Sequence, residues 1–443
     1  MQTALLIENG TLLSSRDTTT LRHGQSVLIE NGIITRIAPG SRFAGFTGRR
    51  IDASGKVVMP GLINAHTHLY STFARGLTKT KPARDFPSVL RNLWWRLDSA
   101  LTTEDCYYSA LVALIDSIRH GATTLIDHHA SPNAVSGSLD AIARAVGETG
   151  LRACLCYEVS DRDGPRIAKE GIAENVRFIR SCQARDGGNL QALFGLHASS
   201  TLSDKTLEEA AGLGHDLQVG FHIHAAEAKS DQSATRRRSR LAVIDRLGRF
   251  GILGRRSIAA HCVHVSGREI ASLVETGTAV AHNPQSNLNN AVGIADVVGM
   301  ARNGVLVGLG TDAMTNNMLE ELRVALWSQR LARSNPSAGF GEVTSALFQG
   351  NAAIAGRIFG LGLGEIRKGS AGDLAIFDYD PPTPLMSANA LGHVLFGLSQ
   401  ARVDTTIAGG RVLMERGQIE LDLDLSRVNA RARELAKNLW QRM

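Results

Sequence analysis

The chain has 443 residues, more than one small hydrophobic core organises and enough for a large barrel with an accessory domain. Hydrophobic residues make up 43% of it and charged residues 20%, the ordinary balance of a soluble globular protein. The formal charge of +6 is small for this length, and the basic residues are scattered except in TRRRSR at 235–240. We interpret that cluster as a solvated loop or the start of a helix, and we expect no nucleic-acid partner.

Cysteine usage and hydropathy indicate the compartment. The five cysteines are odd in number and form no CxxC pair, which argues against disulfides and zinc ribbons and favours a reducing environment. The segment MQTALLIENGTLLSSRD has no basic region and no apolar core long enough for a signal peptide. No uninterrupted apolar run reaches the ~18 residues of a membrane helix, so no membrane partner is expected and a cytoplasmic location is predicted.

The first 56 residues have the texture of β structure. Two short apolar stretches, VLIE and IITRI, surround Asn31-Gly32. This dipeptide favours the two positive backbone φ angles of a type I′ turn, so the segment predicts a β-hairpin.

The same texture returns near the other end of the chain, in DLAIFDYD (373–380) and DTTIAGGRVLMERGQIEL (404–421). Gly409-Gly410 predicts a second tight turn. Because two β-rich ends flank a different middle, we expect the ends to pair into one small domain. The final stretch, SRVNARARELAKNLWQRM, has a helical pattern with Ser426 as a possible cap.

Apolar strand-like runs alternate with amphipathic helical stretches through the middle of the chain. The eight runs are VVMPGLINAHTH, GATTLIDHH, LRACLCYEV, LQALFGLHA, LQVGFHIHAAE, SIAAHCVHV, TAVAHNPQSN and VLVGLGTD. Continuous apolar strands between helices indicate parallel strands buried on both faces, and eight of them predict a (β/α)8 barrel. The expected division is a composite β-sandwich domain from 1–56 and 365–425, a barrel over 57–364 and a C-terminal helix over 426–443.

Most of these runs end in a residue that can bind a metal or move a proton. These residues are His68, His128, Glu158, His197, His224, His261, His282 and Asp312. A barrel carries its active site at the carboxyl ends of its strands, whereas core filling alone would not repeat polar residues there. The pattern therefore predicts an active site rather than eight unrelated core positions.

A metal centre is the chemistry that this ring suggests. A catalytic zinc takes three or more N, O or S ligands and keeps a position open for water. His66 and His68 share one face of the first strand, and Asp312 offers an anionic oxygen. In the fifth run, FHIHAAE, His224 lies nearer the strand end than His222 and is the expected ligand.

Such a centre also needs groups that move protons, since a bound metal lowers the pKa of water and the leaving group must be protonated. Asp312 beside the water would accept a proton, and Glu227, three residues after His224, would carry it to a substrate nitrogen. His261 would polarise the carbon under attack and stabilise the tetrahedral intermediate.

Five motifs follow one another along the chain: PGLINAHTH, HIHAAE, AAHCVH, HNPQSN and GLGTDA. Together they resemble the amidohydrolase superfamily, in its branch of cytosine deaminases, guanine deaminases and chlorohydrolase-like enzymes. NLWWRLDSAL, IDHHASP, GSL and DYDPPTPL are most similar to the SsnA-like aminohydrolases of that branch. The resemblance spans essentially the whole chain.

The resemblance implies a distorted (β/α)8 TIM-like barrel with a small β-sandwich domain formed by both chain ends. It implies one divalent metal, zinc in most members and iron in some. By motif position, the metal ligands would be His66, His68, His224 and Asp312, and the catalytic pair would be Glu227 and His261. His197 matches a histidine that contacts substrate, and Asn283, Ser286 and Asn287 fit the loop after the seventh strand, with Asn283 as a further substrate contact. His282 either shapes the pocket or orients that loop.

Two features bear on the reaction. The fourth run, LQALFGLHASS, has no lysine that could be carboxylated to bridge two metals, which favours a single metal. Chlorohydrolases that displace halide can replace the glutamate that follows the strand-five histidine, but this chain keeps it as Glu227, which favours a leaving group that needs a proton, such as ammonia. We therefore predict deamination of a small-molecule heterocyclic substrate of purine, pyrimidine or pteridine type. Cyclic amide or imide hydrolysis, a chlorohydrolase-like reaction and a silent binding barrel are the alternatives.

The rest of the pocket is less defined by sequence. His128 and His129 end the second run, where substrate contact and a capping or packing role are both open. Glu158 either contacts substrate or belongs to an ion pair. Trp94 and Trp95 either stack on a flat ring or fill the core. The oligomeric state is open, a homo-oligomer included.

Overall fold

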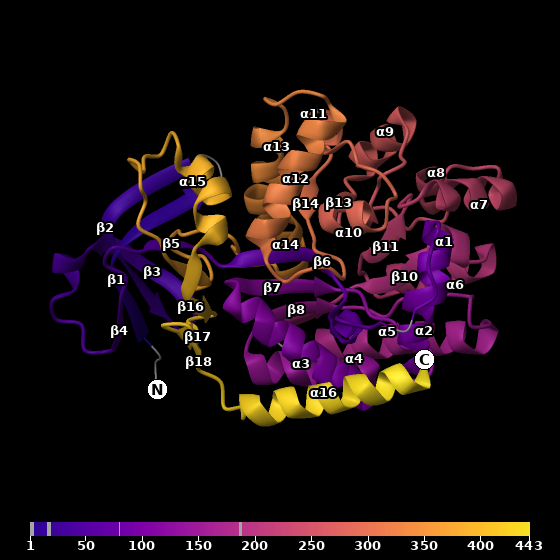
Figure 1. The fold of residues 1–443 in the computed structure, drawn as a ribbon, viewed down its shortest axis with the longest axis horizontal. Helices are drawn as coiled ribbons and strands as arrows, with labels where there is room; N and C mark the ends of the chain where they lie inside the picture. Colours follow the sequence, from indigo (N-terminus) through magenta and orange to yellow (C-terminus); the bar gives the residue numbers. More distant parts are fainter. Residues whose placement is uncertain (1–3, 16–18, 79, 186–187) are drawn as a thin grey trace.

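A computed structural model describes residues 4–15, 19–78, 80–185 and 188–443. Figure 1 shows a barrel of strands surrounded by helices, with a separate sheet at one side to which both ends of the chain contribute. The mixed α/β class expected from the sequence is confirmed.

The barrel consists of eight parallel strands, the fourth of which is interrupted at Leu193. They are β6 (Leu62–Thr67), β7 (Ala122–Asp127), β8 (Arg152–Leu155), β9 (Leu190–Ala192) continued by β10 (Phe194–Ala198), β11 (Phe221–Ala225), β12 (Ile258–His261), β13 (Ala279–His282) and β14 (Val307–Leu309). Most of their residues are buried, which explains why the strands read as continuous apolar runs.

The ring closes through two isolated bridges. Strands β6–β9 form one sheet and β10–β14 another. Parallel bridges between Thr67 and Asp312 and between Val159 and Leu196 join them. Both bridges lie at the carboxyl ends of strands, so the same residues that close the ring border the site.

Helices cover the outside of the barrel, as Figure 1 shows for α3 and α4 on one side and α12 and α14 on the other. They are α3 (Thr103–Arg119), α4 (Ser138–Thr149), α5 (Pro165–Gln183), α6 (Asp204–Asp216), α7 (Lys229–Ser239), α8 (Val243–Arg249), α9 (Gly267–Thr276), α10 (Pro284–Asn289), α11 (Val297–Arg302), α12 (Met318–Ala332), α13 (Phe340–Ser345) and α14 (Asn351–Phe359). The interior between strands and helices is one large apolar cluster.

The chain ends build a nine-stranded sheet with the order β18-β17-β16-β15-β5-β1-β2-β3 and β4 beside β1. Its strands are β1 (Ala4–Ser15), β2 (Thr19–Glu30), β3 (Ile33–Pro39), β4 (Arg49–Asp52), β5 (Val57–Pro60), β15 (Leu374–Asp378), β16 (Arg402–Ala408), β17 (Arg411–Glu415) and β18 (Gln418–Ile419). β5 pairs with β15 and then runs into β6, so the sheet is joined directly to the first barrel strand. The short helix α15 (Ala390–Phe396) lies between β15 and β16.

Both predicted turns of this sheet are confirmed. Asn31 and Gly32 have φ angles of 52° and 81°, and they join β2 to β3. Gly409 and Gly410, with φ angles of 54° and 73°, join β16 to β17. Two consecutive positive φ angles are what a two-residue type I′ turn requires.

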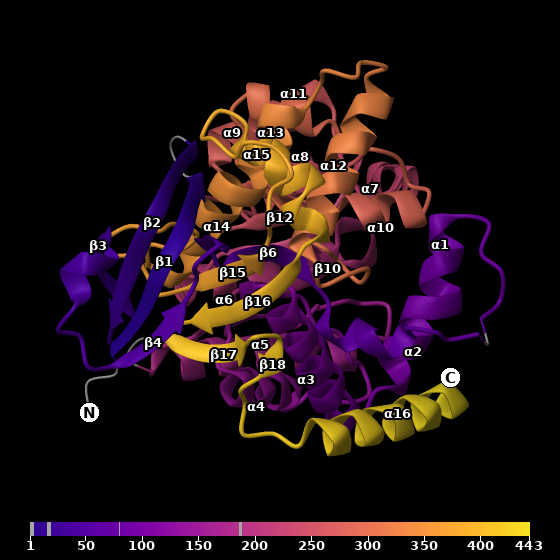
Figure 2. The ribbon, with the colours of Figure 1, turned by 60° about the vertical axis from the view of Figure 1, so that its left-hand side comes forward.

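A long excursion after β6 carries α1 (Phe86–Val89), a π-helical turn (Leu90–Trp94) and α2 (Trp95–Ala100). The C-terminal helix α16 (Leu425–Arg442) packs along α3 and α2, as Figure 2 also shows. Asp424, rather than Ser426, caps α16, because its carboxylate accepts a hydrogen bond from the Arg427 amide at 3.0 Å.

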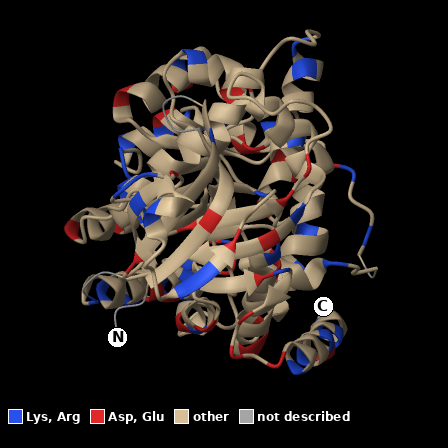
Figure 3. Ribbon diagram, turned by 90° about the vertical axis from the view of Figure 1, so that its left-hand side faces the viewer, with Lys and Arg blue, Asp and Glu red and all other residues tan. Residues whose placement is uncertain are grey.

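Acidic and basic residues are interspersed over the ribbon in Figure 3. Within the described residues, none of the helices is both long enough and apolar enough to cross a bilayer. All five cysteines are buried and unpaired.

Candidate metal centre and active site

Three strand ends bring together the four side chains expected to bind a metal. His66 lies on β6 with His68 just beyond the end of the strand, His224 lies on β11, and Asp312 follows β14. The Nε2 atom of His68 is 2.9 Å from Oδ1 of Asp312 and 3.2 Å from Nε2 of His224. The Nε2 atom of His66 is 3.6 Å from the same Asp312 oxygen.

These distances fit a single metal ion. Ligand atoms bound at about 2 Å from one zinc ion lie roughly 3 to 4 Å from one another. The buried Nε2 atoms of His66 and His261 have no hydrogen-bond partner among the described residues, as expected of atoms that await a ligand. His66, His224, His261 and Asp312 form one group whose ligand atoms lie within 4.8 Å of one another.

The electrostatics of this group favour a positive charge. Burial alone would lower the pKa of His68, but the carboxylates of Asp312 and Glu158 raise it to about 10. Burial lowers the pKa of His66 to about 4, so its ring is neutral at pH 7. A metal cation bound among these groups would place its positive charge where the nearby carboxylates already favour one.

The backbone departs from regular strand geometry where it delivers these side chains. Asp312 and His261 have φ angles of 52° and 72°, in the left-handed region that costs a non-glycine residue about 1–3 kcal/mol. The amides of Thr311 and Asp312 both donate to the carbonyl of His66, at 2.9 and 3.0 Å. At Gly310 a Cβ atom would lie 2.7 Å from the Cβ of His66, so only glycine permits this approach.

The expected catalytic pair lies beside the metal ligands. The Nε2 atom of His261 is 3.7 Å from Oε2 of Glu227 and 3.9 Å from Oδ2 of Asp312. Burial, with the nearby charge of Asp312, raises the pKa of Glu227 well above its usual range. Ser286 donates its hydroxyl to Oδ2 of Asp312, and Oδ1 of Asn287 lies 2.8 Å from Nδ1 of His261. Both residues lie on the short helix α10, where the sequence suggested a loop, and they orient Asp312 and His261.

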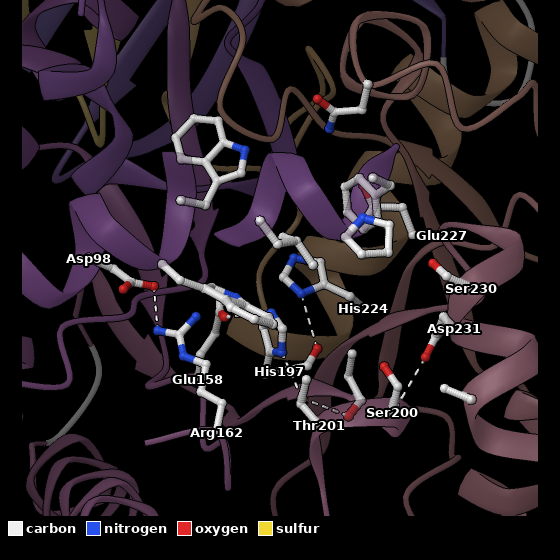
Figure 4. Close-up of a pocket in the computed structure, with 18 of the residues that line it drawn as sticks. Asp98, Glu158, Arg162, His197, Ser200, Thr201, His224, Glu227, Ser230 and Asp231 are labelled. Atoms are coloured by element: carbon white, nitrogen blue, oxygen red, sulfur yellow. Dashed lines mark hydrogen bonds and ion pairs between the residues drawn. The ribbon is translucent and has the colours of Figure 1, made fainter. Parts of the chain in front are cut away.

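A cavity of about 320 Å³ opens onto this centre (Figure 4). His68, His224, Glu227 and Asp312 lie at its inner end. Residues of the excursion after β6 and of α7 line the rest, among them Phe86, Leu90, Trp94, Trp95, Ser230 and Arg237. The volume is at the lower end of what ligand sites need, about 300–1,000 Å³.

His197 and Glu158, two of the predicted substrate contacts, line this cavity. The Nε2 atom of His197 is 3.7 Å from Oε2 of Glu158, and its Nδ1 is 2.7 Å from the Thr201 hydroxyl. Burial lowers the pKa of His197 to about 3 and raises that of Glu158 to about 7. Near neutral pH the two groups therefore offer hydrogen bonds more than full charges.

The structure places His128 and His129 deeper. His128 is fully buried, and its Nε2 lies 3.1 Å from the carbonyl of His222. His129 is also fully buried, and its Nε2 lies 2.9 Å from the hydroxyl of Ser131. Both rings thus bond to protein groups behind the cavity wall.

His282 and Asn283 are likewise buried, at the end of β13. Among the described residues, no hydrogen-bond partner is found for either ring nitrogen of His282 or for the side-chain amide of Asn283. Asn283 packs against the loop that carries Asp312, since a Cβ at Gly310 would lie 2.5 Å from its Oδ1.

Sequence reasoning missed a charged wall of the cavity. Arg162, in the loop after β8, forms a buried ion pair with Asp98 of α2, and its guanidinium lies 5.3 Å from the Trp95 ring (Figure 4). Burial raises the pKa of Asp98 to about 6 despite this pair. The partners are 64 residues apart, and no local pattern signals the contact. Arg237, from the TRRRSR cluster on α7, also lines the cavity.

The fold and the site together define a metal-dependent barrel hydrolase. The Amidohydrolase family matches residues 57–413, which is most of the chain. The protein therefore belongs to the amidohydrolase family.

The chain is similar in sequence to curated relatives over nearly its full length. The chain is 33% identical to a 5-methylthioadenosine/S-adenosylhomocysteine deaminase of Desulforudis audaxviator, over 93% of this chain and 94% of the relative. It is 31% identical to a 5′-deoxyadenosine deaminase of Methanothermobacter thermautotrophicus, over 90% and 91%.

Solved structures show the same fold. An adenosine deaminase from Xanthomonas campestris with bound zinc superimposes with a TM-score of 0.87 at 24% identity, covering 98% of each chain. The guanine deaminase of E. coli gives a TM-score of 0.79 at 20% identity, over 94% of this chain and all of the other.

Proposed function

We propose that this protein is a metal-dependent deaminase that hydrolyses the exocyclic amino group of an adenine-type nucleoside. The observation that carries the proposal is the meeting of His66, His68, His224 and Asp312 with Glu227 and His261 beside one cavity, whose inner end His68, His224, Glu227 and Asp312 line. Curated relatives of similar length named as deaminases of adenine nucleosides support the reaction.

The metal is proposed to be one zinc ion held by His66, His68, His224 and Asp312, with iron as the alternative. A borderline-soft ion such as zinc suits a set of imidazoles with one carboxylate. When bound, such an ion lowers the pKa of a water molecule from about 15.7 to about 7 and so provides a nucleophile at neutral pH.

The side chains around the ion would move the protons. Asp312, through the Oδ2 atom that faces His261, accepts the proton of the attacking water. Glu227, whose pKa burial raises, donates its proton to a ring nitrogen of the substrate, and Asp312 passes the water proton to the departing amino group. Glu227 recovers a proton from the new hydroxyl group on the ring carbon as ammonia leaves. His261 stabilises the charge of the tetrahedral intermediate. Overall a carbon–oxygen bond replaces a carbon–nitrogen bond and ammonia leaves.

The cavity provides contacts for such a substrate. Trp94 and Trp95 offer aromatic surface to a purine ring, and His197 and Glu158 offer hydrogen bonds to its edge. The charged wall formed by Asp98 and Arg162 would bind hydroxyl groups of the nucleoside's sugar. The buried His128, His129, His282 and Asn283 are proposed to shape the site from behind. With five unpaired cysteines, we propose a cytoplasmic location.

The test is a substrate screen with purified, zinc-loaded protein. Adenosine, 5′-deoxyadenosine, methylthioadenosine, adenine, guanine and cytosine are compared by ammonia release and by the ultraviolet change at the ring. We expect turnover of adenine nucleosides to exceed that of the free bases. Silence on every adenine nucleoside by a protein that holds its metal would contradict the proposal.

A further inference from the structure

The three histidine ligands of the proposed metal centre differ in the kind of group that bonds to their Nδ1 atom. In each of them the Nδ1 atom has a hydrogen-bond partner, which leaves Nε2 facing the metal position. His68 and His224 direct Nδ1 at main-chain carbonyls, those of His128 and His197. His66 instead directs Nδ1 at a side chain, the Nε2 atom of His222, at 2.9 Å. Nδ1 of His68 also lies 3.5 Å from Oε1 of Glu158, but only His66 has a side chain as the hydrogen-bond partner of its Nδ1.

A ring-to-ring hydrogen bond can run in either direction, and the surrounding groups select one. The Cys156 thiol donates to the carbonyl of Asp127 at 3.4 Å, because a carbonyl can only accept. The sulfur then faces Nδ1 of His222 at 3.8 Å as a weak acceptor. This arrangement favours the tautomer of His222 that carries its proton on Nδ1 and presents a bare Nε2 to His66.

This direction gives His66 the tautomer that a metal ligand needs. When Nδ1 of His66 donates to His222, its Nε2 holds a free lone pair toward the metal position. The opposite direction would place a proton on that Nε2 and block coordination. The Nε2 atom of His66 has no hydrogen-bond partner within the described structure, which fits the first arrangement.

His222 is also held rigidly. It is fully buried, and its ring stacks on that of His128 with centroids 4.4 Å apart and planes inclined by 25°. The Nε2 atom of His128 lies 3.1 Å from the carbonyl of His222, so the neighbour fixes both the ring and the main chain. Because these contacts hold the buried ring in one orientation, the His222 ring has a specific hydrogen-bonding role and does not merely fill the core.

We propose that His222 is a positioning residue that selects the metal-binding tautomer of His66, with Cys156 setting the direction of the hydrogen bond. The inference rests on the metal centre of the proposed function but not on the identity of the substrate. It also gives His128 a role as the support of His222.

The experiment compares matched variants of the full-length chain by zinc affinity. His222→Phe keeps a flat ring but removes the acceptor, whereas His222→Gln keeps an acceptor oxygen. Cys156→Ala removes the sulfur that accepts from His222, and Cys154→Ala, at another buried cysteine, is its control. Zinc dissociation constants are measured by competition with a chromophoric chelator, and thermal unfolding of the metal-free proteins reports on folding.

We expect H222F to bind zinc roughly ten- to hundredfold more weakly, the usual effect of losing such a partner. H222Q should retain most of the affinity, C156A should lose part of it, and C154A should match the parent. Parental zinc affinity in H222F, or an equal loss in H222Q and H222F, would overturn the proposal. If H222F does not fold, the zinc affinities of H222Q, C156A and C154A test the proposal instead. Equal zinc affinity in C156A and C154A would overturn the proposed direction of the hydrogen bond. A parent protein that binds zinc but deaminates nothing would contradict only the proposed function.

Discussion

The two ends of the active-site cavity are built differently. At the inner end, His66, His224 and Asp312 sit on or just after barrel strands, where main-chain hydrogen bonds of the sheet fix them. At the outer end, Trp94 and Trp95 come from the helical excursion after β6 and are only half-buried. The inner end is therefore a rigid centre for the chemistry, and the outer end is a wall that determines which substrate fits into the cavity.

The outer wall is held by side chains and by the far end of the chain. Trp440 of α16 donates its indole N–H to the carbonyl of Phe73 at 2.7 Å, and Arg442 donates to the carbonyl of Ala100 at 3.0 Å. Arg162 ties α2 to the loop after β8 through Asp98. Changes at the two ends should therefore have different kinetic signatures.

Removal of the metal should have the largest effect. Dialysis against a strong chelator is expected to abolish turnover, because no group other than the metal can activate the water to this degree. Added zinc should restore turnover, and far-ultraviolet circular dichroism should show that the barrel stays folded. Full activity in protein shown to be metal-free by elemental analysis would disprove that turnover depends on a metal at the inner end of the cavity.

Glu227→Gln should come next. The amide keeps the shape but cannot transfer the proton, so kcat is expected to fall by about 10²–10⁴-fold. Zinc content should be unchanged, since Glu227 is not among the proposed ligands. Glu208→Gln, at an exposed acid on α6, is the control and should be fully active. Wild-type kcat in the Glu227 variant would assign the proton transfer to another group.

Asp98→Asn tests the outer wall. The change leaves the buried Arg162 with Asp163, 2.8 Å from its Nε, in place of two carboxylate partners, and kcat/KM is expected to fall roughly tenfold, mainly through KM. The free energy of unfolding should fall by about 3 kcal/mol. Steady-state kinetics and urea unfolding check both effects. A fall confined to kcat would mean that Asp98 acts on the chemical step, and the contrast between the two ends would fail.

Trp440→Phe should give the smallest effect. It removes one hydrogen bond to Phe73 and is expected to cost about 1 kcal/mol of stability, with a slight rise in KM and unchanged zinc affinity. Trp327→Phe, at a Trp that is 47% exposed on α12, is the matched control. Equal melting temperatures for the two variants would show that α16 does not support the wall.

Much of the site could be predicted from sequence because it follows the strand ends. Glu158 and His197 were expected at the site and do line the cavity, since the end of a parallel strand is visible as the end of an apolar run. His128 and His129 end such a run too, but they are fully buried and are not among the residues that line the cavity. A run marks where a strand ends but not which way the next side chain turns.

The sequence by itself determined the barrel, the pairing of the two chain ends and the ring of candidate metal-binding residues at the strand ends. Those features depend on hydrophobic period, turn residues and spacing, which are local. Only the tertiary structure decided the contacts that join distant segments: Asp98 with Arg162, α16 against the outer wall, and His222 with His66. Such contacts form because the closed ring of strands brings these segments together, and no local pattern records which side chains then meet.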